Sequence, residues 1–327
     1  MPDLLLAWIA VIGGLTVLVW SADRFVAGSA AAASNLGISK LIIGLTIVSF
    51  GTSAPEILVA INAALNGIGD MAIGNAVGSN LANIGLVLGI TALVAPLPTQ
   101  RHLITNEMVF LLAVTAFAGF VVWDLHIATW EASVMLLSII PIIFIMSKRQ
   151  QSDMSAAEKA EEEEEIPDLS NKAAALWFAV GLTLLIASSK TLVWGAEQIA
   201  LDFGVSPLVI GLTLLAVGTS LPELAASIMS ALKGHHDIAI GNIIGSNLFN
   251  ILAVMSTPAL ISNIEISPAL LSRDYVSMAL ITVLLAAAIA WSQRSSNNKK
   301  RIGRSLGAVF LALYGAYYYW LFAAGAL

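Results

Sequence analysis

The sequence contains no cysteine, and only 11% of its 327 residues are charged. The lack of cysteine excludes disulfide bonds, cysteine-based metal sites and thiol chemistry. The scarcity of charge, beside 58% hydrophobic residues, excludes an ordinary soluble domain. Apolar runs of about 20 residues recur between short polar breaks, and such runs are long enough to cross the bilayer as helices. The sequence therefore predicts an all-α polytopic membrane protein.

Ten transmembrane helices are predicted from these runs. The first is expected to stay as a helix, because MPDLLLAW has an acidic residue and no basic one before the apolar run, unlike a signal peptide. The approximate limits of the ten are 4–31, 38–65, 71–95, 103–123, 127–147, 173–199, 206–232, 238–263, 270–291 and 302–325.

Lysine and arginine are distributed unequally between the two sides of this layout. Thirteen of the 15 fall at or near one side, and only Lys190 and Arg273 fall at the other. By the positive-inside rule, the loops after helices 1, 3, 5, 7 and 9 are cytoplasmic and both termini are extracytoplasmic. The longest loop holds the acidic run at 158–165, which predicts a solvated, disordered linker on the cytoplasmic side.

An internal repeat organises the chain. Residues 41–89 and 208–256 align without a gap at an offset of 167, and 26 of the 49 positions are identical. The same offset places Gly28 over Gly195, so each copy contains five helices. Because five is odd, the second copy must cross the membrane in the opposite sense, as in the inverted repeats of secondary transporters. We therefore predict repeats at 1–147 and 173–327, joined by a linker at 148–172.

A Pro-Glu pair occurs in each copy, in GTSAPE at 51–56 and GTSLPE at 218–223. A proline inside a helix cannot donate a hydrogen bond, so we expect these helices to loosen at Gly51 and Gly218 and to free carbonyl oxygens. Free carbonyls in a membrane must face a polar cavity or an ion. Two buried glutamates, Glu56 and Glu223, would also be costly unless a cation neutralised them. Carboxylates with neutral oxygens favour a hard cation such as Ca²⁺.

A second repeated motif, GNAVGSNLANI and GNIIGSNLFNI, follows each Pro-Glu pair. Its glycines allow close helix packing. Ser79 with Asn83, and Ser246 with Asn250, are four residues apart on one helical face and could supply neutral oxygens to a small monovalent ion. The alternative is that this motif is only a packing face with amide hydrogen bonds.

Together these motifs resemble the alpha-repeats of the calcium/cation antiporter superfamily, specifically its prokaryotic sodium/calcium exchangers. The resemblance implies exchange of Na⁺ for Ca²⁺ by alternating access at a site in the middle of the membrane. It implies a calcium site made by Glu56, Glu223 and the carbonyl oxygens of Thr52 and Thr219. The implied sodium ligands are Ser49, Ser53, Ala216, Thr219, Ser220, Ser79 and Ser246, with Asn83 and Asn250 near a central position. Because both of the last two are asparagine, dependence on potassium is not expected.

The resemblance also implies a monomer in a prokaryotic plasma (inner) membrane, with Na⁺ and Ca²⁺ as substrates. We expect no cofactor, no nucleic acid and no protein partner. A proton/calcium antiporter using the same glutamates stays open as an alternative. The sequence GIGD at 67–70 is similar to an element of intramembrane aspartyl proteases, but Asp70 lacks a second aspartate deep in a neighbouring helix, so enzyme activity is not expected.

Two groups of charged or titratable residues are assigned no role in ion binding. Asp23, Arg24 and Lys190 lie in the predicted helices 1 and 6, and we interpret them as a charge pair or as interfacial residues. His235 and His236 lie in a predicted turn without a third ligand, which favours a surface pair over a metal site.

Overall fold

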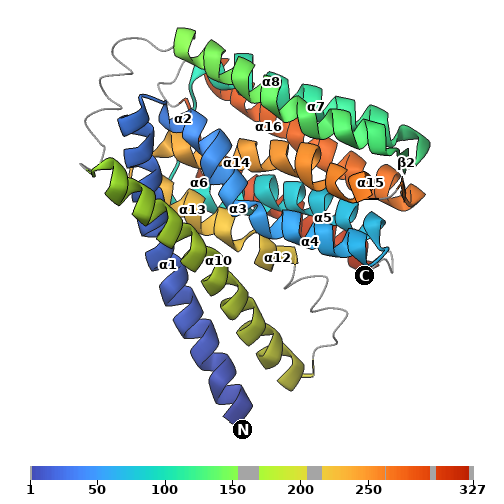
Figure 1. Cartoon of the computed structure of the whole chain (residues 1–327), viewed down its shortest axis with the longest axis horizontal. Coiled ribbons are helices and arrows are strands. Elements are labelled where there is room, and N and C mark those ends of the chain that lie inside the picture. The colour runs from blue at the N-terminus through green and yellow to red at the C-terminus, as the bar shows by residue number, and fades with distance from the viewer. Residues whose placement is uncertain (1, 154–168, 205–215, 262, 295–299, 324–327) are drawn as a thin grey trace.

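The computed structural model describes residues 2–153, 169–204, 216–261, 263–294 and 300–323, and these are almost entirely helical (Figure 1). The α-helices of the first half are α1 (Pro2–Leu36), α2 (Lys40–Ile43), α3 (Ser49–Thr52), α4 (Ala54–Leu65), α5 (Gly69–Ala82), α6 (Gly89–Val94), α7 (Met108–Val121) and α8 (Thr129–Asp153). Those of the second half are α10 (Asn171–Asp202), α12 (Ala216–Thr219), α13 (Leu221–Leu232), α14 (His236–Phe249), α15 (Ser256–Ile261), α16 (Val276–Arg294) and α17 (Arg304–Ala323).

Within this described part, eight helices are long and apolar enough to cross a membrane, and they coincide with eight of the predicted spans. The segments Lys40–Thr52 and Ala54–Leu65 are bent by 44° at the break between them, and they count as a ninth span if the bent pair crosses the membrane as one unit. The predicted span 206–232 lies partly outside the described residues, as does the acidic run at 158–165. The described part of that span is α12 and α13. The protein is therefore an all-helical polytopic membrane protein.

The helix breaks at the Pro-Glu motifs lie two residues later than predicted. Gly51 and Gly218 remain in α3 and α12, and the residues that leave the helical conformation are Ser53 (φ −82°, ψ 3°) and Ser220 (φ −88°, ψ 2°). A new helix begins directly after each serine, with proline at its second position. Proline is tolerated there because the first amides of a helix have no partner within the helix.

Several local features were not predicted from the sequence. π-Helical segments interrupt the spans at η1 (Gly44–Val48), η2 (Asn83–Leu88), η3 (Leu103–Glu107), η6 (Asn250–Val254) and η7 (Leu270–Tyr275). A short 3-10 turn, η4 (Val122–Asp124), ends α7. Two antiparallel pairs of two-residue strands join the halves near the helix ends: β1 (Leu97–Pro98) with β4 (Arg301–Ile302), and β2 (His126–Ile127) with β3 (Ile264–Glu265). η2 and η6, and η3 and η7, begin 167 residues apart.

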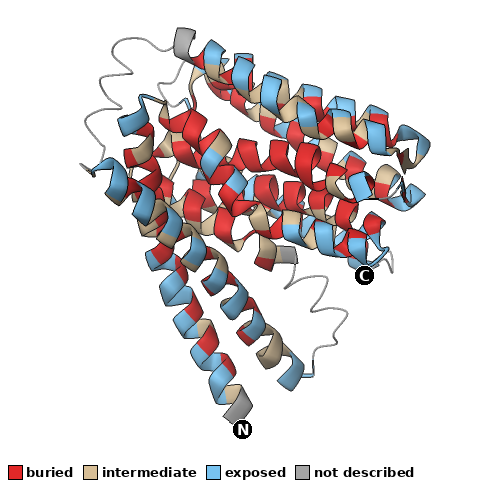
Figure 2. Ribbon diagram, in the orientation of Figure 1, coloured by how far each residue is buried: buried red, intermediate tan, exposed pale blue. Residues whose placement is uncertain are grey.

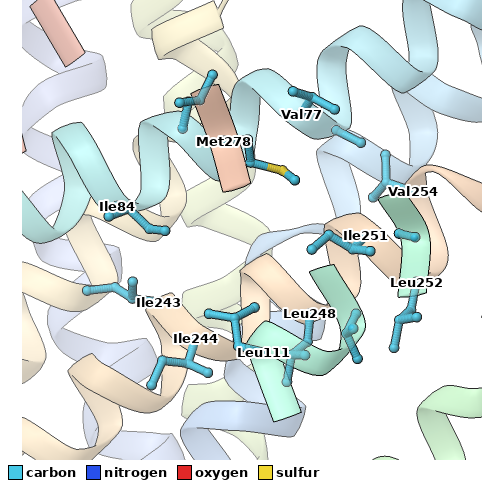
Figure 3. Packing of buried hydrophobic residues seen from close by; sticks show 14 of the residues in the cluster. Val77, Ile84, Leu111, Ile243, Ile244, Leu248, Ile251, Leu252, Val254 and Met278 are labelled. Carbon is cyan, nitrogen blue, oxygen red and sulfur yellow. The ribbon is translucent and has the colours of Figure 1, made fainter. Parts of the chain in front are cut away.

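The two helices that carry the second repeated motif, α5 and α14, form the centre of the molecule. The most apolar window of the span His236–Ile261 is 100% buried and that of Gly69–Val94 is 72% buried, whereas the windows of the outer spans are between 17% and 44% buried. Figure 2 shows this burial as the red centre of the bundle, with exposed residues along α1, α8 and α10. Apolar side chains of the two central spans pack with Leu111 of α7 and Met278 of α16 (Figure 3). The second-motif polar residues Ser79, Asn83, Ser246 and Asn250 are thus buried within the bundle.

Helices α1 and α10 lie side by side and extend beyond the other helices (Figure 1). They run antiparallel and cross at glycines, because a Cβ on Gly28 would lie 2.9 Å from the carbonyl oxygen of Ala174 and one on Gly195 would lie 2.6 Å from that of Ala7. Gly195 and Ala174 follow Gly28 and Ala7 by 167 residues. The two close contacts between α1 and α10 are therefore related by the same offset of 167 residues as the motifs.

Candidate cation site

Two buried carboxylates lie at the breaks of the Pro-Glu helices. Glu56 is in the first turn of α4 and Glu223 in the first turn of α13, and each is only 1% exposed. A negative charge near a helix N-terminus is favoured by the helix dipole. Ser53, three residues before Glu56, is hydrogen-bonded to Glu223, so the two Pro-Glu breaks face each other. The structure thus brings together the two glutamates that the sequence singled out.

The hydroxyl groups of the same motifs contact these carboxylates across the two halves. Ser53 Oγ donates a hydrogen bond to Glu223 Oε1 (3.2 Å), and the Thr219 side chain interacts with Glu56. The arrangement is not symmetric, because Ser220, the equivalent of Ser53, has no hydrogen-bond partner for its hydroxyl within the described part of the chain. The sequence repeat could not reveal this difference.

Thr52 and Asn242 form a second cross-half contact beside the glutamates. The Thr52 hydroxyl donates to Asn242 Oδ1 (3.1 Å) and lies 3.5 Å from Ser246 Oγ. Asn242 Nδ2 donates to Ser227 Oγ (2.9 Å) and to the backbone oxygen of Glu223 (3.3 Å). Asn242 was not among the predicted site residues. The signal that could have found it is its repetition as Asn75 at the start of the second motif.

The serine and asparagine pairs of the second motif are all buried in the centre of the bundle. Ser79 and Ser246 are 3% and 0% exposed, and Asn83 and Asn250 begin the π-helical segments η2 and η6. Within the described residues, neither polar atom of the Asn83 or Asn250 side chain has a hydrogen-bond partner. The two motif helices do contact each other, because Asn80 Nδ2 donates to the backbone oxygen of Asn247 (3.2 Å).

The remaining pair of predicted residues, Ser49 and Ala216, begins α3 and α12. The Ser49 hydroxyl donates to the Leu45 carbonyl oxygen of its own helix (2.7 Å). The side chain of Ala216 lies outside the described part of the structure. Both positions thus begin the short helices that precede the Pro-Glu breaks, and their role as ligands stays a prediction.

Unpartnered oxygen atoms are concentrated at this site. Buried polar atoms in proteins nearly always have a hydrogen-bond partner, yet among the described residues five oxygen atoms here have none. These are Glu56 Oε2, Glu223 Oε2, Asn83 Oδ1, Asn250 Oδ1 and Ser220 Oγ. Carboxylate, amide and hydroxyl oxygens are the ligands that hard cations prefer. The described residues contain no cluster of three or more His, Cys, Asp or Glu side chains suited to a metal, so the charge of the site comes from two carboxylates.

A cavity of about 520 Å³ reaches this site from between α4, α10 and α12. Its lining includes Pro55 and Thr219 beside the glutamates, and Asn62, Lys190 and Glu197 further out. Next to it, Ser189 of α10 donates to the Gly218 carbonyl oxygen (3.0 Å), which Pro222 leaves without a helical partner. Ser189 was missed from the sequence because its equivalent in the first half is Ala22.

Two other sequence-based interpretations can be compared with the structure. The prediction of a histidine surface pair is wrong for His235, which is 3% exposed because the start of α14 packs into the bundle. Asp70 is an exposed residue of the first turn of α5, where its carboxylate accepts a hydrogen bond from the Met71 amide (2.8 Å). Its position at a helix end agrees with the rejection of an aspartyl protease site.

Comparison with known proteins gives consistent matches over nearly the whole chain. The family model described as "Sodium/calcium exchanger protein" matches residues 6–148 and 173–323. The sodium/calcium exchanger MaX1 of Methanosarcina acetivorans is 30% identical, with 83% of this chain and 88% of that protein covered. The inner membrane protein YrbG of Escherichia coli (strain K12) is 38% identical, with 97% and 98% covered. A solved structure of the sodium-calcium exchanger NCX_Mj, soaked with 10 mM Na⁺ and zero Ca²⁺, is similar with a TM-score of 0.80 at 29% identity, covering 96% and 98%.

Proposed function

Because this chain belongs to the sodium/calcium exchanger protein family, we propose that it exchanges Na⁺ for Ca²⁺ across the membrane by alternating access. The observation that carries the proposal is the pair of buried carboxylates, Glu56 and Glu223, each with an unpartnered oxygen. The exchangers to which the chain is similar are named for the same two ions. This function is transport, and it involves no chemical step and no cofactor.

For the ligands of the two ions we propose the residues that the resemblance to the exchanger family implies. Ca²⁺ would be held by Glu56, Glu223 and the carbonyl oxygens of Thr52 and Thr219. Na⁺ would be held at flanking positions by hydroxyl and carbonyl oxygens of the two motifs, with Asn83 and Asn250 near the centre. The flanking residues are Ser49, Ser53, Ser79, Ala216, Thr219, Ser220 and Ser246.

The charge of the site explains why the two ions would take turns. Without an ion, the two glutamates place two negative charges in the membrane interior, which is costly. One Ca²⁺ or two Na⁺ would neutralise them, and three Na⁺ would leave one positive charge. Only the loaded and nearly neutral site can then be enclosed while α1 and α10 move past it. Each passage of Ca²⁺ in one direction would therefore require Na⁺ in the other.

We further propose that the chain consists of ten transmembrane helices in two inverted repeats, at 1–147 and 173–327, joined by a cytoplasmic linker at 148–172. Both termini would be extracytoplasmic and the protein would lie in a prokaryotic inner membrane as a monomer. The support is the distribution of lysine and arginine, the offset of 167 between the motifs, and the similarity to a protein named for the inner membrane.

The test is uptake of ⁴⁵Ca²⁺ into proteoliposomes that contain the purified protein and internal Na⁺. Matched vesicles contain choline instead, or carry a proton gradient. We expect uptake only with internal Na⁺, and we expect Glu223→Gln to abolish it, since one carboxylate cannot neutralise Ca²⁺. Uptake driven only by protons would make the protein a proton/calcium antiporter with the same glutamates. Absence of Ca²⁺ uptake under both gradients would contradict the substrate assignment.

A further inference from the structure

An ion pair links the two halves of the molecule at one end of the bundle. Lys233 Nζ lies 2.7 Å from Asp23 Oδ1 and 3.4 Å from the backbone oxygen of Asp23. Asp23 is in α1, which belongs to the first half, and Lys233 is the residue that ends α13 in the second half. Both side chains are about one-third exposed, at 34% and 30%, so a change in conformation can separate them without burying an unpaired charge.

Arg24, the next residue along α1, strengthens the connection at this end. Its guanidinium group lies 4.9 Å from the centre of the Trp177 ring of α10 and 3.9 Å from Asp23. A guanidinium over an indole face is held by a cation–π interaction. α1 is thus connected to α13 through Asp23 and to α10 through Arg24.

The equivalent positions at the other end lack such a pair. An offset of 167 relates Asp23 to Lys190 and Asn66 to Lys233. Among the described residues Lys190 has no ion-pair partner, and it lines the cavity that reaches the site. Asn66 instead donates hydrogen bonds to Asn62, to its backbone oxygen (2.8 Å) and to its Oδ1 (2.6 Å). The cavity therefore lies at the end without the ion pair, and its lining includes neither Asp23 nor Lys233, so we call the end with the ion pair the closed end.

We propose that the Asp23–Lys233 pair is a conformational latch that favours the state in which the cavity beside Lys190 is open. The inference rests on the proposed alternating access, in which inverted repeats exchange their conformations. In the opposite state Lys190 would approach Asn66 as Asp23 now approaches Lys233. A cation facing an amide is a weaker attraction than a cation facing a carboxylate. The sequence difference between the two ends therefore biases the transporter toward one orientation.

The size of the bias follows from the exposure of the pair. Partly exposed ion pairs of this kind shift an equilibrium by roughly two- to fivefold. The latch would therefore tilt the balance between the two states without preventing the transition, as repeated transport requires.

Accessibility to a thiol reagent can test the latch, since the chain has no cysteine of its own. Asn62 lines the cavity, and its equivalent Met229 packs against buried residues at the closed end. We would introduce Asn62→Cys or Met229→Cys and measure the rate of labelling by a polar maleimide in detergent. In the Asp23→Asn background, the Met229→Cys reporter should react about two- to fivefold faster and the Asn62→Cys reporter more slowly. The charge exchange Asp23→Lys with Lys233→Asp should restore both rates.

A converse variant examines the other end. Asn66→Asp would create a partner for Lys190 in the opposite state, so labelling of the Met229→Cys reporter should again increase. This increase should disappear when Lys190→Gln is added. Unchanged rates in Asp23→Asn would overturn the latch, and so would equal acceleration of both reporters, which indicates a loosened fold. A normal response of the reporters in a protein that moves no Ca²⁺ would instead contradict the proposed function and leave the latch intact.

Discussion

The close packing of α14 against the first Pro-Glu span makes Gly245 sensitive to the smallest substitution. A Cβ added at Gly245 would lie 2.5 Å from the Leu45 carbonyl oxygen and 2.5 Å from Ser49 Oγ. Real Cβ contacts of this kind are close to 3.4 Å or longer. One of the two contacts is backbone, so α14 or η1 must move by most of an ångström to accept the methyl group.

We expect Gly245→Ala to destabilise the protein by about 1–3 kcal/mol, the usual cost of overpacking a core. This corresponds to a lower melting temperature by roughly 2–4 °C per kcal/mol in a large domain. Because Ser49 is both a contact of the new methyl group and a predicted Na⁺ ligand, we also expect slower Na⁺-driven Ca²⁺ uptake.

Thermal unfolding in detergent, followed by the fluorescence of the eight tryptophans, measures the stability change. Gly315→Ala is the matched control, because a Cβ at that helical position in α17 has no described atom within 4 Å. The control should stay within about 0.5 kcal/mol of the native protein. If Gly245→Ala and Gly315→Ala unfolded at the same temperature and transported equally well, the inferred close contact between α14 and η1 would be wrong.

Three further predictions concern single side chains. Ser53→Ala should lower the ion-free melting temperature more than Ser220→Ala, because of these two serines only Ser53 donates to a buried carboxylate in the described structure and such bonds contribute about 1.5–3 kcal/mol; equal losses would contradict the asymmetry. Ser189→Ala should cost about 1 kcal/mol more than Ser188→Ala in the same unfolding assay, since Ser188 bonds only within its own helix. Burial and the positive charges of Lys40, Lys233 and His236 lower the pKa of His235 to about 4 from 6.5. Between pH 6.5 and 4, His235 is therefore protonated in the unfolded chain but neutral in the folded protein. The free energy of unfolding should fall as the pH drops through this range, and His235→Gln should reduce that loss.

The positions of eight candidate membrane spans could be predicted from the sequence because an apolar run is a matter of local composition. The apolar runs predicted the eight helices that are long and apolar enough to cross a membrane, and the bent pair at Lys40–Leu65 was predicted as a single span. The paired Pro-Glu motifs identified Glu56 and Glu223, since an acidic residue inside an apolar run is costly wherever the helix packs. The amino-acid sequence by itself therefore determined the class of protein and singled out the two carboxylates of the candidate site.

Only the tertiary structure decided which side chains meet. The two motif copies both contain this serine, yet Ser53 contacts Glu223 while its equivalent Ser220 has no described partner. The contact made by Ser189 and the burial of His235 could likewise not be predicted, because each depends on how one helix packs on another from a distant part of the chain. The position of the helix break, at Ser53 rather than Gly51, was set by where the following helix could begin. Crossing angles and helix starts depend on packing over the whole bundle, which a local pattern of residues does not specify.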